Sequence, residues 1–146
     1  MRNPVVEEDL QSITDYGLDW RSFAGKTILI SGANGFLPAY MVETLLYLNE
    51  TRTEEKVRVI GIVRSRDKAL ARFAEYSNRP DLQLIVQDVC QPVSIKEKVD
   101  YIIHAASQAS PKYYAKRRTY SHPSFYSRHN MTLHLQGQHN HNNPLL

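Results

Sequence analysis

The chain has 146 residues, one cysteine and a formal net charge of +3, which together exclude several classes of protein. The length suits one domain with one core, and a single cysteine excludes an internal disulfide framework and fits a reducing compartment. The N-terminal stretch MRNPVVEEDL lacks the apolar region of a secretory signal, and no apolar run approaches the roughly 20 residues of a membrane span. We therefore expect a soluble, cytoplasmic protein with no membrane partner.

Charge is distributed unevenly along the chain. Residues 1–100 contain all 15 acidic residues and 13 of the 18 lysines and arginines, whereas residues 101–146 contain no acid. Five of the six histidines follow residue 120, and residues 115–146 lack valine and isoleucine. The composition predicts a boundary near Tyr114.

The first expected element is an amphipathic helix over residues 3–17, in which Asn3 caps the helix and Pro4 takes the first helical position. Three apolar residues fall on one face of this helix: Val6, Leu10 and Ile13. Gly17 can end it. Two aromatic residues then anchor this arm to the main body: Trp20 and Phe23.

Four apolar, strand-like runs follow, at residues 26–31, 57–64, 82–89 and 99–106. Two helical segments separate the first three runs. The helix at residues 36–49 has an apolar stripe of Leu37, Met41, Leu45 and Leu48. The helix at residues 66–76 is capped by Ser65 and has its inward face at Leu70, Phe73 and Ala74. Residues 49–56 read as a polar loop, and residues 90–98 are too few for a full crossover helix.

Strands that alternate with helices and are apolar on both faces are typical of a parallel sheet covered by helices on both sides. We predict an α/β fold: a partial Rossmann-type, doubly wound sheet with strand order 3-2-1-4. The chain then divides into an N-terminal helical arm (1–24), a dinucleotide-binding half domain (25–114) and an irregular basic tail rich in histidine and asparagine (115–146).

The stretch SGANGFLP at residues 31–38 carries the strongest functional signal. A strand, a Gly-x-x-Gly turn and a helix form the context of a dinucleotide-binding loop, in which backbone N–H groups meet a pyrophosphate. The residues expected to do so are Gly32, Asn34, Gly35, Phe36 and Leu37. Pro38 replaces the usual third glycine, at little cost in a first helical turn. The alternative is a plain glycine–asparagine turn.

Three segments together resemble one family. KTILISGANGFLPAYMVETLL, QDVCQPV and VDYIIHAASQASPKYY are similar to the NAD-dependent epimerase/dehydratase family, the extended short-chain dehydrogenase/reductases that act on nucleotide sugars. The similarity is greatest to UDP-glucuronate decarboxylases and dTDP-glucose 4,6-dehydratase-like enzymes, and it covers about residues 24–114.

The resemblance implies roles for particular residues. Asp88 and Val89 would bind the adenine, and the end of the fourth strand would line the cofactor with Ala105, Ala106 and Ser107. The sugar-nucleotide would meet Ser110, Pro111 and Tyr113. His104 is assigned no role, because a single histidine at a strand end is more often structural.

The choice between NAD and NADP stays open. A fold of this type usually has an acid at the end of its second strand to bind the ribose, whereas this chain has Arg64, which can accept a 2′-phosphate. Asp67 could supply a ribose contact, and Arg64 and Arg66 could instead lie in a solvated loop. The resemblance favours NAD as the cofactor, with NADP possible.

The tail departs from the family pattern. Relatives carry a Tyr-x-x-x-Lys pair, in which lysine lowers the tyrosine pKa and the phenolate takes a proton during hydride transfer from the sugar. No such pair occurs in this chain: Tyr113 and Tyr114 have Arg117 and Arg118 four residues on. We therefore expect a catalytically incomplete chain with no catalytic residue.

Three interpretations of the tail are open: an aberrant end on a truncated enzyme, a basic nucleic-acid-binding segment, or a metal site. The metal site would use His134, His139 and His141. The absence of acidic residues from the tail favours an aberrant end on a truncated enzyme. We therefore predict no metal and no nucleic-acid partner. The function expected is an NAD(P)-binding N-terminal portion of a nucleotide-sugar epimerase, dehydratase or decarboxylase; the alternative is a non-catalytic NADP-binding or interaction protein. The oligomeric state is open.

Overall fold

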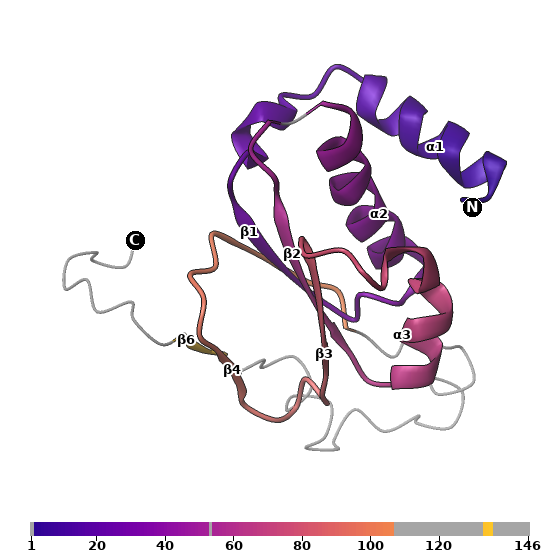
Figure 1. Cartoon of the computed structure of the whole chain (residues 1–146). Coiled ribbons are helices and arrows are strands. Elements are labelled where there is room, and N and C mark those ends of the chain that lie inside the picture. Colours follow the sequence, from indigo (N-terminus) through magenta and orange to yellow (C-terminus); the bar gives the residue numbers. More distant parts are fainter. Residues whose placement is uncertain (1, 53, 107–132, 136–146) are drawn as a thin grey trace, which may run out of the picture.

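A computed structural model describes residues 2–52, 54–106 and 133–135 (Figure 1). In chain order its elements are α1 (Pro4–Asp15), the 3₁₀ turn η1 (Trp20–Phe23), β1 (Thr27–Ser31), α2 (Phe36–Thr51), β2 (Arg58–Val63), α3 (Arg66–Arg72), the 3₁₀ turn η2 (Ala74–Tyr76), β3 (Leu82–Val86), β4 (Val93–Ile95), β5 (Tyr101–His104) and β6 (Leu133–Leu135). The four predicted strands correspond to β1, β2, β3 and β5. Each has its predicted place in the chain, with ends shifted by a few residues.

The main sheet has the order β3-β2-β1-β5, and every neighbouring pair is parallel. This confirms the predicted order 3-2-1-4, since β5 is the fourth of the predicted strands. Ile30 at the centre of the sheet lies opposite Gly61 on one side and Ile103 on the other. Because all four strands are parallel, their carboxyl ends lie at the same edge of the sheet.

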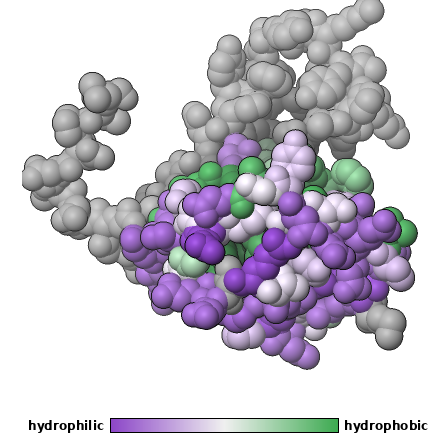
Figure 2. Space-filling model, turned by 90° about the horizontal axis from the view of Figure 1, so that it is seen from above, coloured by the Kyte–Doolittle hydropathy of each residue, from purple (hydrophilic) through white to green (hydrophobic). Residues whose placement is uncertain are grey.

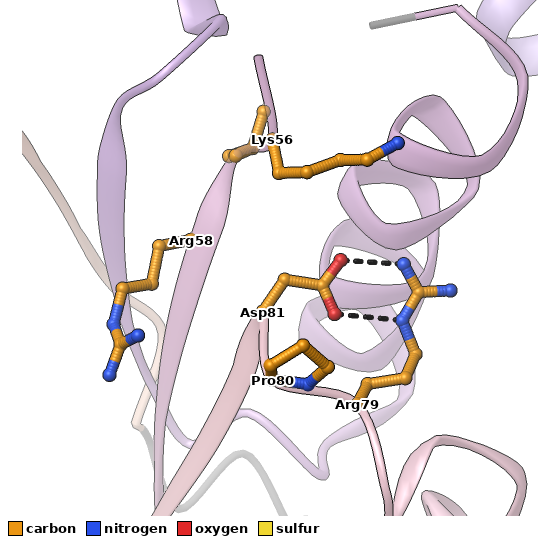
Figure 3. A pocket seen from close by; sticks show the side chains of 6 residues that line it. Lys56, Arg58, Arg79, Pro80 and Asp81 are labelled. Atoms are coloured by element: carbon orange, nitrogen blue, oxygen red, sulfur yellow. Dashed lines mark hydrogen bonds and ion pairs between the residues drawn. The ribbon is translucent and has the colours of Figure 1, made fainter. Parts of the chain in front are cut away.

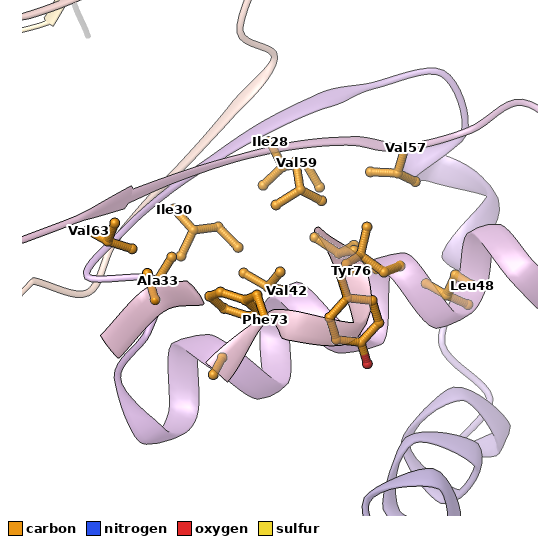
Figure 4. Close-up of a cluster of buried hydrophobic side chains, with 14 residues drawn as sticks. Ile28, Ile30, Ala33, Val42, Leu48, Val57, Val59, Val63, Phe73 and Tyr76 are labelled. Carbon is orange, nitrogen blue, oxygen red and sulfur yellow. The ribbon is translucent and has the colours of Figure 1, made fainter. Parts of the chain in front are cut away.

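One face of the sheet is covered by α2 and α3, and the larger core cluster fills the space between them (Figure 4). The cluster combines strand residues such as Ile28 and Val59 with Val42 of α2 and with Phe73, the residue that follows α3. The other face carries a smaller cluster, in which Leu29, Ile60 and Ile62 meet Val93, Ile95 and Val99. Helices were expected on both faces. Within the described residues they cover one face, and β4 with its flanking loop packs on the other.

Helix α1 forms as predicted at its ends. The Asn3 side chain accepts the Val5 N–H at 3.0 Å, and Gly17 follows the last turn with φ of +81°. The predicted apolar face is wrong at one position, because Ile13 is exposed and Thr14 is buried in its place. The Thr14 carbonyl accepts hydrogen bonds from the Trp20 indole and the Arg52 guanidinium, each at 3.0 Å, which turns this side of the helix inward.

Helix α2 is buried on nearly all sides because it lies between the sheet and α1 (Figure 1). The predicted stripe is wrong at Leu37, which is 62% exposed in the first turn. The helix also extends to Thr51, into the segment predicted as a loop. There the buried Asn49 side chain donates to the Val57 carbonyl at 2.7 Å and to Asp81 at 2.6 Å, and it accepts the Val57 N–H at 2.8 Å. Asn49 thus ties the end of α2 to the starts of β2 and β3.

The second predicted helix is split into α3 and η2, and its inward face is shifted by one position. Phe73 is buried as predicted, but Leu70 is 48% exposed and Ala74 is exposed. The buried residues are Ala69, Phe73 and Tyr76. Ser65 caps α3, since its hydroxyl accepts the Lys68 N–H at 3.5 Å.

The segment after β3 contains no helix, as predicted, but its Val93–Ile95 forms strand β4. This strand pairs in parallel with β6, so three residues of the segment predicted to be irregular form a strand. The other residues after position 106 lie outside the described part of the chain.

Candidate functional site

The loops that follow the four parallel strands meet at one edge of the sheet. These are the glycine turn after β1, the Arg64–Ser65 link after β2, the Gln87–Gln91 loop after β3 and the Ala105–Ala106 segment after β5. From β1 the chain continues to β2, which pairs with one side of β1, whereas β5 pairs with the other side of β1. Ligands of open α/β sheets bind in the crevice at such a switch point, outside the carboxyl ends of the strands.

The glycine turn is held by its own backbone and by β2. Gly32 has φ of +67°, a left-handed conformation that glycine adopts without strain. The Gly35 N–H bonds to the Gly32 carbonyl at 2.8 Å, and the Ala33 N–H bonds to the Ile62 carbonyl at 3.1 Å. Ala33 itself is fully buried. The turn is therefore part of the core and not a loose connection.

Strand β2 makes room for this turn at Gly61, a residue that the sequence analysis did not single out. A Cβ placed on Gly61 would lie 2.9 Å from the Ala33 Cβ and 2.9 Å from the Leu84 Cδ2. A glycine inside a strand often marks such a close approach of another segment, and this was the available signal.

Helix α2 begins at the turn without a side-chain cap. Gly35 is the N-cap residue and makes no capping hydrogen bond, and the first intrahelical bond runs from the Ala39 N–H to the Gly35 carbonyl at 2.9 Å. Pro38 is buried and has no N–H to satisfy. The N–H groups of Phe36 and Leu37 stand at the positive end of a 16-residue helix. This arrangement fits a phosphate group of a dinucleotide.

The side chains of Phe36 and Leu37 point into solvent at the same edge. Phe36 is 85% exposed, and its ring packs edge-on against Tyr40 with the centroids 5.7 Å apart. These two large apolar side chains are exposed beside the uncapped start of α2. A ligand with a flat apolar part can cover them. Asn34 is half-buried within the turn.

Ser31, the last residue of β1, links the glycine turn to the end of β5. Its buried hydroxyl oxygen accepts the N–H groups of Ala105 at 3.1 Å and Ala106 at 3.2 Å, and lies 2.8 Å from His104 Nδ1. A Cβ placed on Gly32 would come within 2.9 Å of the Ala106 Cα. The sequence analysis missed Ser31 and gave His104 no role, because their contact joins residues 73 positions apart.

The remaining predicted residues lie at the same edge. Arg64 is exposed, and within residues 2–106 its guanidinium makes no ion pair, nor does that of Arg66. Asp88 accepts the Cys90 N–H on its carboxylate at 2.9 Å and the Gln91 N–H on its backbone carbonyl at 3.0 Å. Val89 packs against the smaller core cluster, so its side chain serves the fold.

Several predicted residues fall outside the described part of the chain: Ser107, Ser110, Pro111 and Tyr113, together with Tyr114, His139 and His141. His134 lies in β6, where only the backbone is described. In the part that is described, no three histidine, cysteine or acidic side chains gather as a metal site would require. No helix in that part is long and apolar enough to cross a membrane.

A shallow hollow at the opposite, amino edge of the sheet is lined by residues 56–58 and 79–81 (Figure 3). Its charges compensate one another. Arg79 donates two hydrogen bonds to Asp81, at 2.8 and 2.6 Å, and Arg58 pairs with Glu97. Lys56 bonds to the Asn49 carbonyl. Seen from above, the surface is mostly hydrophilic (Figure 2). The hollow belongs to the structural network around Asn49.

Comparisons with known proteins identify the family of the chain. The sequence model of the NAD dependent epimerase/dehydratase family matches residues 28–136. An uncharacterized oxidoreductase of Saccharomyces cerevisiae, YDR541C, is 30% identical over 89 residues, which are 56% of this chain and 24% of that protein. A crystal structure of yeast methylglyoxal/isovaleraldehyde reductase Gre2 complexed with NADPH is 30% identical over 44% of this chain and 19% of that one, with a TM-score of 0.35. The chain thus spans about a quarter or less of the length of these relatives.

Proposed function

The chain belongs to the NAD dependent epimerase/dehydratase family, and we propose that it binds a nicotinamide dinucleotide across the carboxyl ends of β1 and β5. The observation that carries the proposal is the uncapped start of α2, which follows a buried glycine turn at the switch point of the sheet. The family is NAD-dependent, and the residues present fit the cofactor's pyrophosphate. We propose a nucleotide sugar as the substrate class, of the kind used by UDP-glucuronate decarboxylases and dTDP-glucose 4,6-dehydratases.

In this proposal the pyrophosphate accepts hydrogen bonds from the backbone of Phe36 and Leu37, beside Gly32, Asn34 and Gly35. The adenine lies at Asp88 and Val89. The Asp88 carboxylate accepts the Cys90 N–H at 2.9 Å, and an ionised carboxylate offers about four lone-pair sites to hydrogen-bond donors.

The nicotinamide end lies beside Ala105 and Ala106, with Ser107 next in the chain. When bound, the cofactor supplies a hydride acceptor. The protein's part is to bind and orient it at the β1–β5 crevice. Contacts from Ser110, Pro111 and Tyr113 to a sugar-nucleotide remain a prediction.

Binding is tested by titrating the 146-residue chain with NAD, NADP and UDP. We expect saturable binding of a dinucleotide and its loss in Gly35→Val, whose side chain would meet the Gly32 carbonyl at 3.2 Å and the Pro38 ring at 3.4 Å. Circular dichroism should show unchanged helix content in that variant. A folded chain that binds neither dinucleotide would refute the proposal.

Arg64 is proposed to set the choice between NAD and NADP. Its guanidinium is exposed at the end of β2, where dinucleotide folds recognise the 2′ position of the adenosine ribose. Arg64→Asp should move the ratio of the two affinities towards NAD by about tenfold or more, since it removes a charge-assisted bond and adds repulsion. Arg21→Asp, an exposed site on η1, is the matched control. An unchanged ratio would leave Arg64 without a role in cofactor choice.

We further propose that this chain holds the cofactor but does not turn over a nucleotide sugar, because its 146 residues include no Tyr-x-x-x-Lys pair. A general base contributes typically 10²–10⁴-fold, and orientation of the reacting carbon about 7–11 kcal/mol. Incubation with UDP-glucuronate or dTDP-glucose and NAD should give no NADH absorbance. Turnover lost in Tyr113→Phe would contradict this. A non-catalytic NADP-binding protein is the second candidate, and the exposed Arg64 at the end of β2 favours it.

A further inference from the structure

The contacts of Ser31 determine where its single proton lies. A hydroxyl offers one donor and two acceptor lone pairs. Ser31 Oγ accepts the Ala105 N–H at 3.1 Å and the Ala106 N–H at 3.2 Å, and these two bonds use both lone pairs. The Ser31 O–H is therefore left to donate to His104 Nδ1, which lies 2.8 Å away.

This donation requires a neutral imidazole. An Nδ1 that accepts a hydrogen bond carries no proton, so the ring proton of His104 sits on Nε2. In the doubly protonated ring, Nδ1 becomes a donor. It would then face an oxygen whose lone pairs are already taken by two backbone amides, so the hydrogen bonds around the Ser31 hydroxyl would have to rearrange.

The two amides belong to the segment that closes over the glycine turn. A Cβ on Gly32 would stand 2.9 Å from the Ala106 Cα and 3.1 Å from the Ala105 carbonyl oxygen, which shows how closely the two segments fit. Any movement of Ala105 or Ala106 changes the wall of the crevice between β1 and β5.

We propose that Ser31 and His104 are positioning residues for the dinucleotide site. The Ser31 hydroxyl, oriented by neutral His104, holds the Ala105–Ala106 segment against the glycine turn, and dinucleotide affinity falls when His104 takes up a proton. This inference rests on the proposed function.

The surroundings of His104 offer few other charges. Strand β1 and residues 32–39 contain no ionisable side chain. On β5 the only other ionisable group is Tyr101, and Asp100, just before the strand, is engaged at the far end with Lys98 and the Thr27 N–H, each at 3.0 Å. The other ionisable groups at this edge, Arg64 and Asp88, lie in the loops after β2 and β3 and not on β1 or β5.

The first test needs no cofactor. ¹⁵N NMR of the histidine rings in the full chain should show His104 with its proton on Nε2, and Ser31→Ala should remove that preference. Amide exchange at Ala105 and Ala106 should become about five- to tenfold faster as His104 is protonated, the size expected for loss of one hydrogen bond. A proton on Nδ1 in the neutral ring would overturn the inference.

The second test compares dinucleotide affinity across pH. In the wild type we expect affinity to fall about five- to tenfold along the His104 titration seen by NMR. His104→Asn supplies an acceptor that does not titrate, so it should retain binding and lose the pH dependence. His104→Leu should bind weakly at every pH, and Ser31→Thr, which keeps the hydroxyl, should behave as wild type.

The same pH dependence in His104→Asn as in the wild type would overturn the positioning role. Absence of dinucleotide binding at every pH would overturn the proposed function and the affinity claim with it. Amide exchange at Ala105 and Ala106, compared between the wild type and His104→Asn, would then decide without any ligand whether Ser31 and His104 hold these two residues in place.

Discussion

Replacing Gly32 with alanine separates backbone strain from steric contact, because the chain contains a matched control. Gly32 and Gly17 both have positive φ, +67° and +81°. A Cβ at Gly17 meets nothing within 4 Å, whereas one at Gly32 lies 2.9 Å from the Ala106 Cα. The left-handed conformation costs a non-glycine residue about 1–2 kcal/mol at either site. Overpacking against the backbone of Ala106 adds roughly 1–3 kcal/mol at Gly32 alone.

We therefore expect Gly17→Ala to lower the free energy of unfolding by about 1–2 kcal/mol and Gly32→Ala by about 2–5 kcal/mol. Urea unfolding followed by circular dichroism measures both. Dinucleotide affinity, measured by calorimetry on folded protein, should fall at least about tenfold for Gly32→Ala and stay unchanged for Gly17→Ala, since a shift near 1 Å at a binding site is costly. Equal losses of stability in the two variants would show that Ala106 does not press on the turn.

Other predictions concern the interactions that hold the site's scaffold. Asn49→Ala should lower the free energy of unfolding in urea by about 2–6 kcal/mol, because it leaves the buried N–H and carbonyl of Val57 without hydrogen-bond partners. The exposed control Thr51→Ala should change this free energy by under about 0.5 kcal/mol. Hydrogen bonds from Arg79 lower the pKa of Asp81, so this group's contribution to stability is present above the ordinary value of 3.8 and is lost as pH falls through the folded pKa. Asp81→Asn should therefore be less stable than the wild type at pH 7, with a gap that closes in acid; a constant gap would contradict the linkage. Gly61→Ala should weaken dinucleotide binding and cost about 1–3 kcal/mol, because its Cβ would press on Ala33.

The sheet could be predicted because parallel strands buried on both faces leave continuous apolar runs in the sequence. Residues 28–30 and 59–63 are buried on both sides, and such runs are visible without knowledge of their neighbours. The strand order came from the alternation of strands and helices and from the rules that govern their connections. The ends of α1 and the start of α3 were predictable because capping depends on residues next to each other.

The phase of α3 could not be predicted from seven helical residues. Ala69, Leu70, Phe73 and Ala74 fit two inward faces about 100° apart, and the position of the sheet alone decides that Ala69 and Phe73 face the core. The burial of α2 on both sides depends on α1, which is remote in sequence.

The residues that shape the site were missed for a related reason. Ser31, Gly61 and Asn49 each act through a partner that folding brings close: Ser31 on residues 104–106, Gly61 on Ala33, Asn49 on Val57 and Asp81. A serine at a strand end and a glycine within a strand are too common to be singled out in one sequence.

Pro38 is the position at which this chain departs from the dinucleotide fingerprint. The third glycine of the dinucleotide fingerprint allows close contact between helix and strand, and here a buried proline takes its place. Proline has no N–H, the Gly35 N–H is used by the Gly32 carbonyl, and the Ala39 N–H begins the helical ladder. The start of α2 thus presents the N–H groups of Phe36 and Leu37 to a ligand. Two donors can serve one phosphate, so in the proposed complex the loops after β2, β3 and β5 would hold the rest of the cofactor. Ser31 and Gly61 place the glycine turn among these strands, and the proposed site would depend on them for that reason.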